Sequence, residues 1–309
     1  MRYSVLNFSD GRSFTELAER WRRFEALGFD GAWIVDDLLV AGYTDFEPWA
    51  LLAGLARETR RMRIGTLIST IRLRHPTFLA AQAITLDHAS GGRAALGIGA
   101  GEPEQNGPAG NPPWSAVETL DRLTEQASIL RELLDGRAVV HPEGYYPTTV
   151  AALPAPVAQP SLVIAAHGPK GLRAAARYAD TWNFVGGQRY KAGPKPDTSE
   201  GWRTLPECVA ETERLMERVD TACGEVGRDP ATLGRSLLAL RPPVDPLESV
   251  DAFDEYTGSY ERFGLEEMTF SWPPQSTMGG KVPSAADEAR FERIAAERIL
   301  SRPSYTGGA

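Results

Sequence analysis

Short apolar runs alternate with longer amphipathic segments along most of the chain. Apolar runs bounded by glycine or polar residues predict buried strands, and apolar residues at helical spacing predict helices. The expected strands cover residues 2–8, 30–35, 63–68, 93–98, 161–166, 181–184, 235–240 and 267–271. The expected helices cover residues 13–27, 46–60, 76–89, 115–134, 170–179, 206–226, 247–263 and 285–300. This alternation predicts parallel strands joined by helical crossovers.

The rhythm favours an α/β fold of the (β/α)8 TIM-barrel class over an open doubly wound sheet. Two irregular stretches interrupt it: residues 135–160, after the fourth helix, and residues 186–205, after the sixth strand. Both are rich in the residues that mark loops, so we interpret them as insertions into the barrel. We expect a single barrel domain over residues 1–301, followed by a flexible tail at residues 302–309.

Several helix ends carry recognisable signals. Ser13 with Glu16 three residues later predicts a capping box at the start of the first helix. Pro76 suits the first turn of the third helix, and Gly91 with Gly92 suits its end.

Composition narrows the function classes. The 309 residues carry 33 Lys and Arg against 41 Asp and Glu, a net charge of −8. There is no long basic run, so nucleic acid is not an expected partner. No apolar stretch approaches the ~18 residues that a membrane span needs, and the first residues lack the pattern of a signal peptide. We expect a soluble cytoplasmic protein without a membrane partner.

Cysteine and histidine are too scattered to predict a metal site. Cys208 and Cys223 lie in one expected helix without metal-binding spacing, which agrees with a reducing compartment. The histidines form neither an H-x-H nor an H-E-x-x-H pattern. They are His75, His88, His141 and His167.

The segment 63–110 contains the strongest candidate site. Two neighbouring strands end in small or hydroxyl residues, and a glutamate follows the second strand. The carboxyl ends of barrel strands form active sites, and small residues there let a flat ligand lie against the backbone. The residues concerned are Ser69 and Thr70, then Gly99, Ala100, Gly101 and Glu102. A dinucleotide fingerprint is excluded because the third glycine of G-x-G-x-x-G would fall at Glu102.

The loop after the fifth strand is a candidate phosphate site, because the first amides of the following helix point outward at the positive end of its dipole. An ordinary strand-to-helix turn remains the alternative. The loop residues are Ala166, His167, Gly168, Pro169, Lys170 and Gly171.

Three carboxylates are acid–base candidates: Asp36, Asp37 and Glu102. For one of the two aspartates, helix capping or a solvated loop is the alternative. Other strand ends and the insertions supply candidate substrate contacts: Asn7, Phe8, Tyr145, Tyr146, Trp182, Tyr190 and Trp202.

Three ordered blocks resemble the luciferase-like (bacterial luciferase-type) flavin- and deazaflavin-dependent oxidoreductases. The blocks are GTLISTIRLRHP, TLDHASGGRAALGIGAGE and IAAHGPKGLRAAARYADTWN. The resemblance implies a barrel that binds FMN or coenzyme F420, with GAGE and AAHGP favouring F420. It is clear from residue 2 to residue 183 and weaker beyond residue 186.

The resemblance also implies roles for particular residues. A non-proline cis peptide would fall at Leu67–Ile68 and back the middle ring of the cofactor, bordered by Ser69 and Thr70. Gly168 to Gly171 would match the phosphate loop. Glu102 would be the proton donor, and Gln105 would face the ring. The implied cofactor-binding set is Asp36, Leu67, Ile68, Ser69, Thr70, Gly99, Ala100, Gly101, Gln105, Ala166, His167, Gly168, Pro169, Lys170 and Gly171.

One departure stands out: relatives often carry histidine after an acidic residue at the second strand, where this chain has Asp36 and Asp37. Either Glu102 and Asp37 would then form the acid–base pair, or the reaction needs no imidazole. We expect an oxidoreductase that transfers hydride to or from a small organic substrate, or a monooxygenase, acting as a homodimer. The alternatives are a flavin-binding relative without activity and a barrel glycoside hydrolase that uses Glu102 and Asp37.

Overall fold

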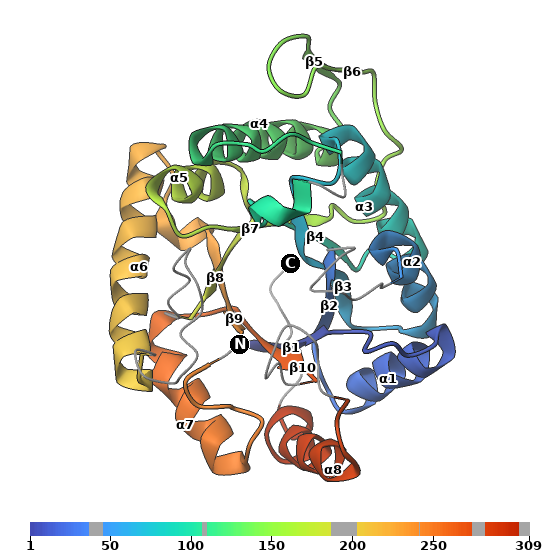
Figure 1. The fold of residues 1–309 in the computed structure, drawn as a ribbon, viewed down its shortest axis with the longest axis vertical. Coiled ribbons are helices and arrows are strands. Elements are labelled where there is room, and N and C mark those ends of the chain that lie inside the picture. Colours follow the sequence, from blue (N-terminus) through green and yellow to red (C-terminus); the bar gives the residue numbers. More distant parts are fainter. Residues whose placement is uncertain (37–45, 107–109, 187–202, 241, 274–281, 303–309) are drawn as a thin grey trace.

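The computed structural model describes residues 1–36, 46–106, 110–186, 203–240, 242–273 and 282–302. Within them, eight parallel strands close into a barrel in the order β1-β10-β9-β8-β7-β4-β3-β2 (Figure 1). The strands are β1 (Arg2–Asn7), β2 (Gly31–Asp36), β3 (Arg63–Thr70), β4 (Ala94–Gly99), β7 (Ser161–Ala165), β8 (Thr181–Val185), β9 (Gly234–Ala239) and β10 (Glu267–Trp272).

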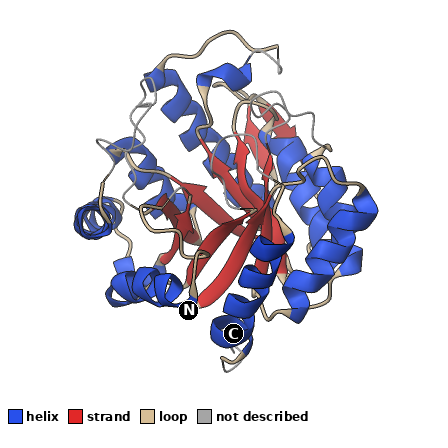
Figure 2. Cartoon of the chain, turned by 60° about the horizontal axis from the view of Figure 1, so that its bottom comes forward, coloured by secondary structure: helices blue, strands red, loops and turns tan. Residues whose placement is uncertain are grey.

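Helices form a ring outside the strands (Figures 1 and 2). They are α1 (Phe14–Ala26), α2 (Pro48–Glu58), α3 (Pro76–Ser90), α4 (Ala116–Leu134), α5 (Pro169–Tyr178), α6 (Leu205–Glu225), α7 (Val250–Tyr260) and α8 (Ala285–Ile294). Short turns are η1 (Pro103–Asn106), η2 (Pro230–Thr232), η3 (Glu261–Phe263) and the π-helix η4 (Ala295–Leu300). The predicted (β/α)8 barrel is confirmed.

Strand side chains alternate between two apolar layers, as the pleat requires. On β1, Val5 packs outward in the layer shared with the helices, and Leu6 packs inward in a smaller cluster with Trp33 and Leu67. The inner cluster lies inside the barrel, so the described part of the chain has a packed core within its strands.

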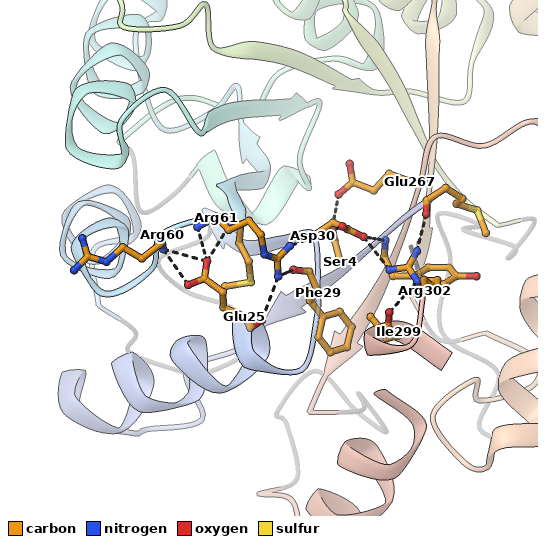
Figure 3. Close-up of polar contacts among 12 residues, drawn as sticks. Ser4, Glu25, Phe29, Asp30, Arg60, Arg61, Glu267, Ile299 and Arg302 are labelled. Carbon is orange, nitrogen blue, oxygen red and sulfur yellow. Dashed lines mark hydrogen bonds and ion pairs between the residues drawn. The ribbon is translucent and has the colours of Figure 1, made fainter. Parts of the chain in front are cut away.

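The amino-terminal end of the barrel is closed by buried polar contacts. Glu267 accepts hydrogen bonds from the Ser4 hydroxyl at 2.5 Å and the Trp33 indole at 2.9 Å. Nearby, the Arg302 guanidinium donates to Asp30 and to the carbonyl of Ile299 (Figure 3). The carboxyl ends of the strands therefore remain as the place for a site.

The first insertion is more ordered than expected. It contains an antiparallel hairpin of β5 (Val139–His141) and β6 (Thr148–Val150), which lies outside the helical ring beside α4 (Figure 1). Most of the second insertion lies outside the described residues. No described helix is long and apolar enough to cross a membrane.

Candidate active site

The end of β3 departs from regular strand geometry. Its register with β4 shifts between Thr66 and Ser69, and the peptide bond Leu67–Ile68 is cis, at the predicted position. Because the bulge adds a residue to one strand, Leu67 lies in the inner apolar cluster and Ile68, the next residue, packs against that cluster. Two successive side chains thus line the barrel interior at this strand end.

The glycines of β4 have a reason within the protein itself. A Cβ at Gly97 would lie 2.3 Å from the carbonyl oxygen of Thr66, and one at Gly99 would lie 2.8 Å from Cδ1 of Ile68. The contact at Gly97 is with backbone and is too close for any other residue, whereas at Gly99 the end of the Ile68 side chain would have to move. The sequence analysis ascribed Gly99 to a ligand ring, and that stays a prediction; the backbone of β3 by itself requires glycine at position 97.

Adjacent strands bring most of the predicted residues to one edge of the barrel mouth. Asp36 pairs in register with Ser69, Thr70 with Gly99, and Gly99 with Ala165. The ends of β2, β3, β4 and β7 are therefore contiguous.

Asp36 is fully buried and engaged. One carboxylate oxygen accepts hydrogen bonds from the Ser69 hydroxyl at 2.6 Å and the Trp49 indole at 2.9 Å, and it also pairs with Arg74. Its other oxygen has no partner in the described part of the chain. Asp36 thus neither caps a helix nor lies in solvent, so those alternatives are wrong for it. Asp37 lies outside the described residues.

Glu102 is exposed just beyond the end of β4, after Gly101, whose φ of +65° favours glycine. Arg72, which the sequence analysis missed, lies close by. Its Nε donates to the carbonyl of Ala100 at 3.0 Å. Burial lowers the pKa of Arg72, and the charges of Glu102 and Glu104 oppose that effect.

The start of α5 offers an open set of backbone donors. Gly168 is the N-cap and makes no side-chain cap, and Pro169 follows at the first helical position. Helix geometry leaves the next two amides, of Lys170 and Gly171, without acceptors inside the helix. Nothing lies within 4 Å of a Cβ built at Gly168, so neither packing nor backbone strain explains that glycine.

Two cations lie at this loop. The Lys170 ammonium pairs with Asp121 of α4, so its charge is already partly compensated. The Arg218 guanidinium of α6, which the sequence analysis missed, donates to the carbonyl of His167 at 2.6 Å. Arg218 occurs in a regular amphipathic helix, and no local pattern distinguishes it from other surface arginines.

The contacts of His167 favour its neutral form. Its Nε2 accepts the backbone N–H of Val185 at 3.2 Å. Withdrawal of the ring from water, with a smaller contribution from Arg218, lowers the pKa of His167. His167 as a whole is exposed to solvent, but its Nε2 is in contact with the backbone N–H of Val185 at the end of β8.

The predicted substrate contacts separate into three groups. Phe8 packs against the inner cluster at the mouth. Asn7 and Trp182 are buried, and Trp182 stacks on Phe184 in the outer layer, away from the barrel interior. Tyr145 and Tyr146 lie on the insertion against α4. Tyr190, Trp202 and the Gln105 side chain lie outside what the structure describes.

Ser271 is a buried polar residue near the barrel mouth that the sequence analysis did not identify. It shares the inward face of β10 with Glu267, is 7% exposed, and its hydroxyl has no partner among the described residues. Ser271 pairs in register with Leu6 of β1, which belongs to the inner cluster. The alternation of side chains along β10 could have predicted that Ser271 points into the barrel.

The chain belongs to the luciferase-like monooxygenase family, whose model matches residues 2–224. It is 32% identical over 218 residues to a phthiodiolone/phenolphthiodiolone dimycocerosates ketoreductase of Mycobacterium kansasii, covering 67% of this chain and 53% of that protein. It is 28% identical over 211 residues to 4-hydroxyprotoasukamycin monooxygenase of Streptomyces nodosus subsp. asukaensis, covering 66% and 55%. The chain thus spans about half the length of the curated relatives it matches.

Solved structures share the fold at lower identity. The coenzyme F420-dependent tetrahydromethanopterin reductase of Methanopyrus kandleri has a TM-score of 0.70 at 16% identity, with 97% of this chain and 98% of that chain covered. The FMN complex of the oxygenating constituent of 3,6-diketocamphane monooxygenase from Pseudomonas putida has a TM-score of 0.56 at 19% identity, covering 85% and 74%.

Proposed function

We propose that this protein is an oxidoreductase that binds coenzyme F420, or FMN in its place, and oxidises or reduces a small organic substrate at the carboxyl end of the barrel. One observation carries the proposal. The open amino terminus of α5 and the inward bulge of β3 lie at the same edge of the barrel mouth, joined by β4 and β7. A ligand with a flat ring and a phosphate fits that combination.

The residues present fit such a group. Ile68 is only partly buried and offers an apolar surface for the ring, and the neighbouring Leu67 is buried in the inner cluster. The amides of Lys170 and Gly171 would hold a phosphate, with open space above Gly168 and the Arg218 charge behind it. When bound, the cofactor supplies a ring atom that accepts or donates hydride.

Glu102 is the residue we assign to proton transfer. It is exposed at the mouth, beside the glycine-rich end of β4 and close to the charge of Arg72. Its carboxylate would take the proton from an alcohol as hydride leaves, or return it in the reverse direction. Asp37 remains part of the proposal as a second acid–base group.

The activities named for two relatives support two candidate substrate classes. A ketoreductase among them supports a carbonyl and secondary-alcohol pair, which suits F420. A monooxygenase among them supports FMN and oxygen as the second candidate. We also propose a homodimer, which light scattering of the purified protein would test.

Cofactor binding is the first test. The purified protein is titrated with F420 and, separately, with FMN, and binding is followed by the change in cofactor fluorescence. We expect saturable binding of at least one of them, with F420 the tighter. If neither binds, the proposal is wrong. If one binds and a panel of secondary alcohols, ketones and oxygen gives no turnover, the non-catalytic alternative replaces it.

Substitution of Glu102 is the second test. Glu102→Gln keeps the size of the side chain but removes its basicity, so turnover should fall on the order of 100-fold or more, while the cofactor Kd changes little. Glu104→Gln, a neighbouring exposed carboxylate on η1, is the matched control and should keep the wild-type rate. Equal rates for wild type and Glu102→Gln would remove Glu102 from the chemistry.

A further inference from the structure

A stack of arginines and aromatic rings connects the first insertion to the candidate site. The Arg72 guanidinium lies 5.0 Å from the centroid of the Trp114 ring. Arg122 of α4 lies 4.3 Å from the same ring and 4.4 Å from the ring of Tyr145 in the insertion. Contacts at such distances are attractive between a cation and a ring face. We call Arg72, Trp114, Arg122 and Tyr145 the arginine–aromatic stack.

Arg72 is the inner end of this stack and is 3% exposed. Its Nε donates to the carbonyl of Ala100 at 3.0 Å, and its Nη2 donates to the Thr119 hydroxyl of α4 at 3.0 Å. Ala100 precedes Glu102 by two residues. The buried guanidinium therefore ties the segment that carries Glu102 to the start of α4.

A second connection reaches the same loop from the insertion. The hydroxyl of Tyr146 donates to the carbonyl of Ile71 at 3.3 Å, next to Arg72 in the chain. The insertion itself is fixed on α4 because Glu125 accepts the backbone N–H groups of Tyr145 at 3.0 Å and Tyr146 at 2.6 Å. Two routes from the insertion thus converge on residues 71 and 72.

We infer that Arg72 is a positioning residue for Glu102, and that the insertion at residues 135–160 supports Arg72 through the arginine–aromatic stack instead of covering the substrate. The inference rests on the proposed function only in giving Glu102 a role in proton transfer. The insertion lies outside the helical ring beside α4, where a support would be placed (Figure 1). Tyr146 is 6% exposed and its hydroxyl is used within the protein.

The effect of Arg72 is tested first without any cofactor. In protein with labelled alanine methyl groups and 15N, Arg72→Met should shift the methyl signal of Ala100 and add millisecond exchange at Gly101 and Glu102. The bond to the Ala100 carbonyl is lost, while a side chain of similar length still fills the space. Arg72→Lys should restore part of the wild-type signal. Arg22→Met, which removes an exposed arginine of α1 paired with Glu58, is the control and should leave these signals unchanged.

The role of the insertion is tested by two smaller changes. Tyr146→Phe removes the bond to Ile71 alone, and Trp114→Leu removes the stacking ring. Both should perturb Ala100 and Glu102 in the same direction as Arg72→Met but by less. Val140→Thr, at a 75% exposed position of the same hairpin, should not perturb them. These variants also decide the matter if Arg72→Met fails to fold.

A double-mutant cycle then tests whether Arg72 acts through Glu102. In an assay with the cofactor that binds, Arg72→Met should lower kcat about tenfold or more, as expected for loss of a buried hydrogen bond, with little change in the cofactor Kd. In the Glu102→Gln background the same substitution should have no further effect. Additive losses would overturn the inference.

Failure of this inference differs from failure of the proposed function. Unchanged signals of Ala100 and Glu102 in a folded Arg72→Met variant would overturn the positioning role, whatever cofactor binds. Absence of binding of F420 and FMN to the wild-type protein would overturn the proposed function, and the signals measured without cofactor would still report on Arg72.

Discussion

Asp36 shows how one buried carboxylate can organise a strand end. Its donors come from three places: Trp49 on α2, Ser69 at the end of β3, and Arg74 in the loop before α3. Arg74 also pairs with Glu47, the N-cap of α2. Since hydrogen bonds to a buried charge are costly to leave unmade, this network fixes the backbone on which the candidate site is built.

Removal of the Asp36 charge should destabilise the protein. Asp36→Asn would leave Arg74 paired with Glu47 alone among its described acidic partners and would place an amide among three donors. We expect a loss of about 3 kcal/mol in the free energy of unfolding, measured by urea denaturation. Glu292→Gln is the matched control, because Glu292 forms an ion pair with Arg23 in which both side chains are well exposed. Its loss should stay within about 1 kcal/mol. A similar small loss for Asp36→Asn would contradict the structural role.

The sequence alone places Asp36 and Arg72 near strand ends, but it does not predict where their side chains point. Asp36 looks like a member of a polar pair before a loop, and Arg72 looks like one arginine among several. Their burial depends on the β3 bulge and on α4, which come from distant segments. The direction of a side chain at a strand end thus depends on tertiary contacts, which the local sequence pattern does not reveal.

At the scale of elements, signals at helix ends are the most predictable part of the chain. Ser13 and Glu16 form the expected capping box, and Gly91 ends α3 at φ +73°. Both depend on hydrogen bonds and backbone angles within a few residues. The hairpin of β5 and β6 was not predicted, because strands of three residues are too short to show a period.

The start of α5 allows a sharp test of the phosphate site. Gly168 has φ −86° and ψ 159°, which any residue can adopt at an N-cap. Gly168→Asp should cap the first amides of α5 and so raise the free energy of unfolding by a few tenths of a kcal/mol up to about 1 kcal/mol. The same carboxylate would occupy and repel a phosphate site, so affinity for F420 or FMN should fall about tenfold or more.

Two comparisons control this prediction. Gly168→Asn caps the same amides without a charge, so it should weaken cofactor binding less than Gly168→Asp does. Riboflavin lacks a phosphate, so its affinity should be the same for wild type and Gly168→Asp. Thermal unfolding and fluorescence titration give the two quantities. Equal weakening for FMN and riboflavin would mean that the phosphate does not bind at α5.

For the whole molecule, the polar contacts that close the barrel and the candidate site lie at opposite ends of the strands. The amino-terminal end holds Glu267 and its buried donors, which close the barrel. The carboxyl end holds the β3 bulge, Glu102 and the start of α5. In barrels, loops at the carboxyl end can vary without loss of the core. The insertion extends this arrangement, since it begins after α4 and returns along it to the carboxyl end.

We expect two histidines to make the stability of the whole protein depend on pH. Burial lowers the pKa of His75 and of His167, and each ring accepts a backbone N–H: His75 from Thr77 at the start of α3, and His167 from Val185. Because the folded pKa lies below the value in the unfolded chain, the unfolded state binds more protons once the pH falls below about 6.5. The free energy of unfolding should therefore decrease as the pH is lowered from 7.5 to 5.5.

Variants separate this effect from the titration of carboxylates, which lies mainly at lower pH. His75→Asn retains an N-cap acceptor and His167→Gln retains an acceptor for Val185, and neither side chain titrates. The double variant should lose much of the decrease between pH 7.5 and 5.5, followed by urea denaturation at each pH. His88→Gln is the control, because the His88 ring nitrogen donates to the carbonyl of Ala155 and the glutamine amide can donate there too. If the double variant and the control follow the same pH dependence as the wild type, His75 and His167 do not govern stability in this range.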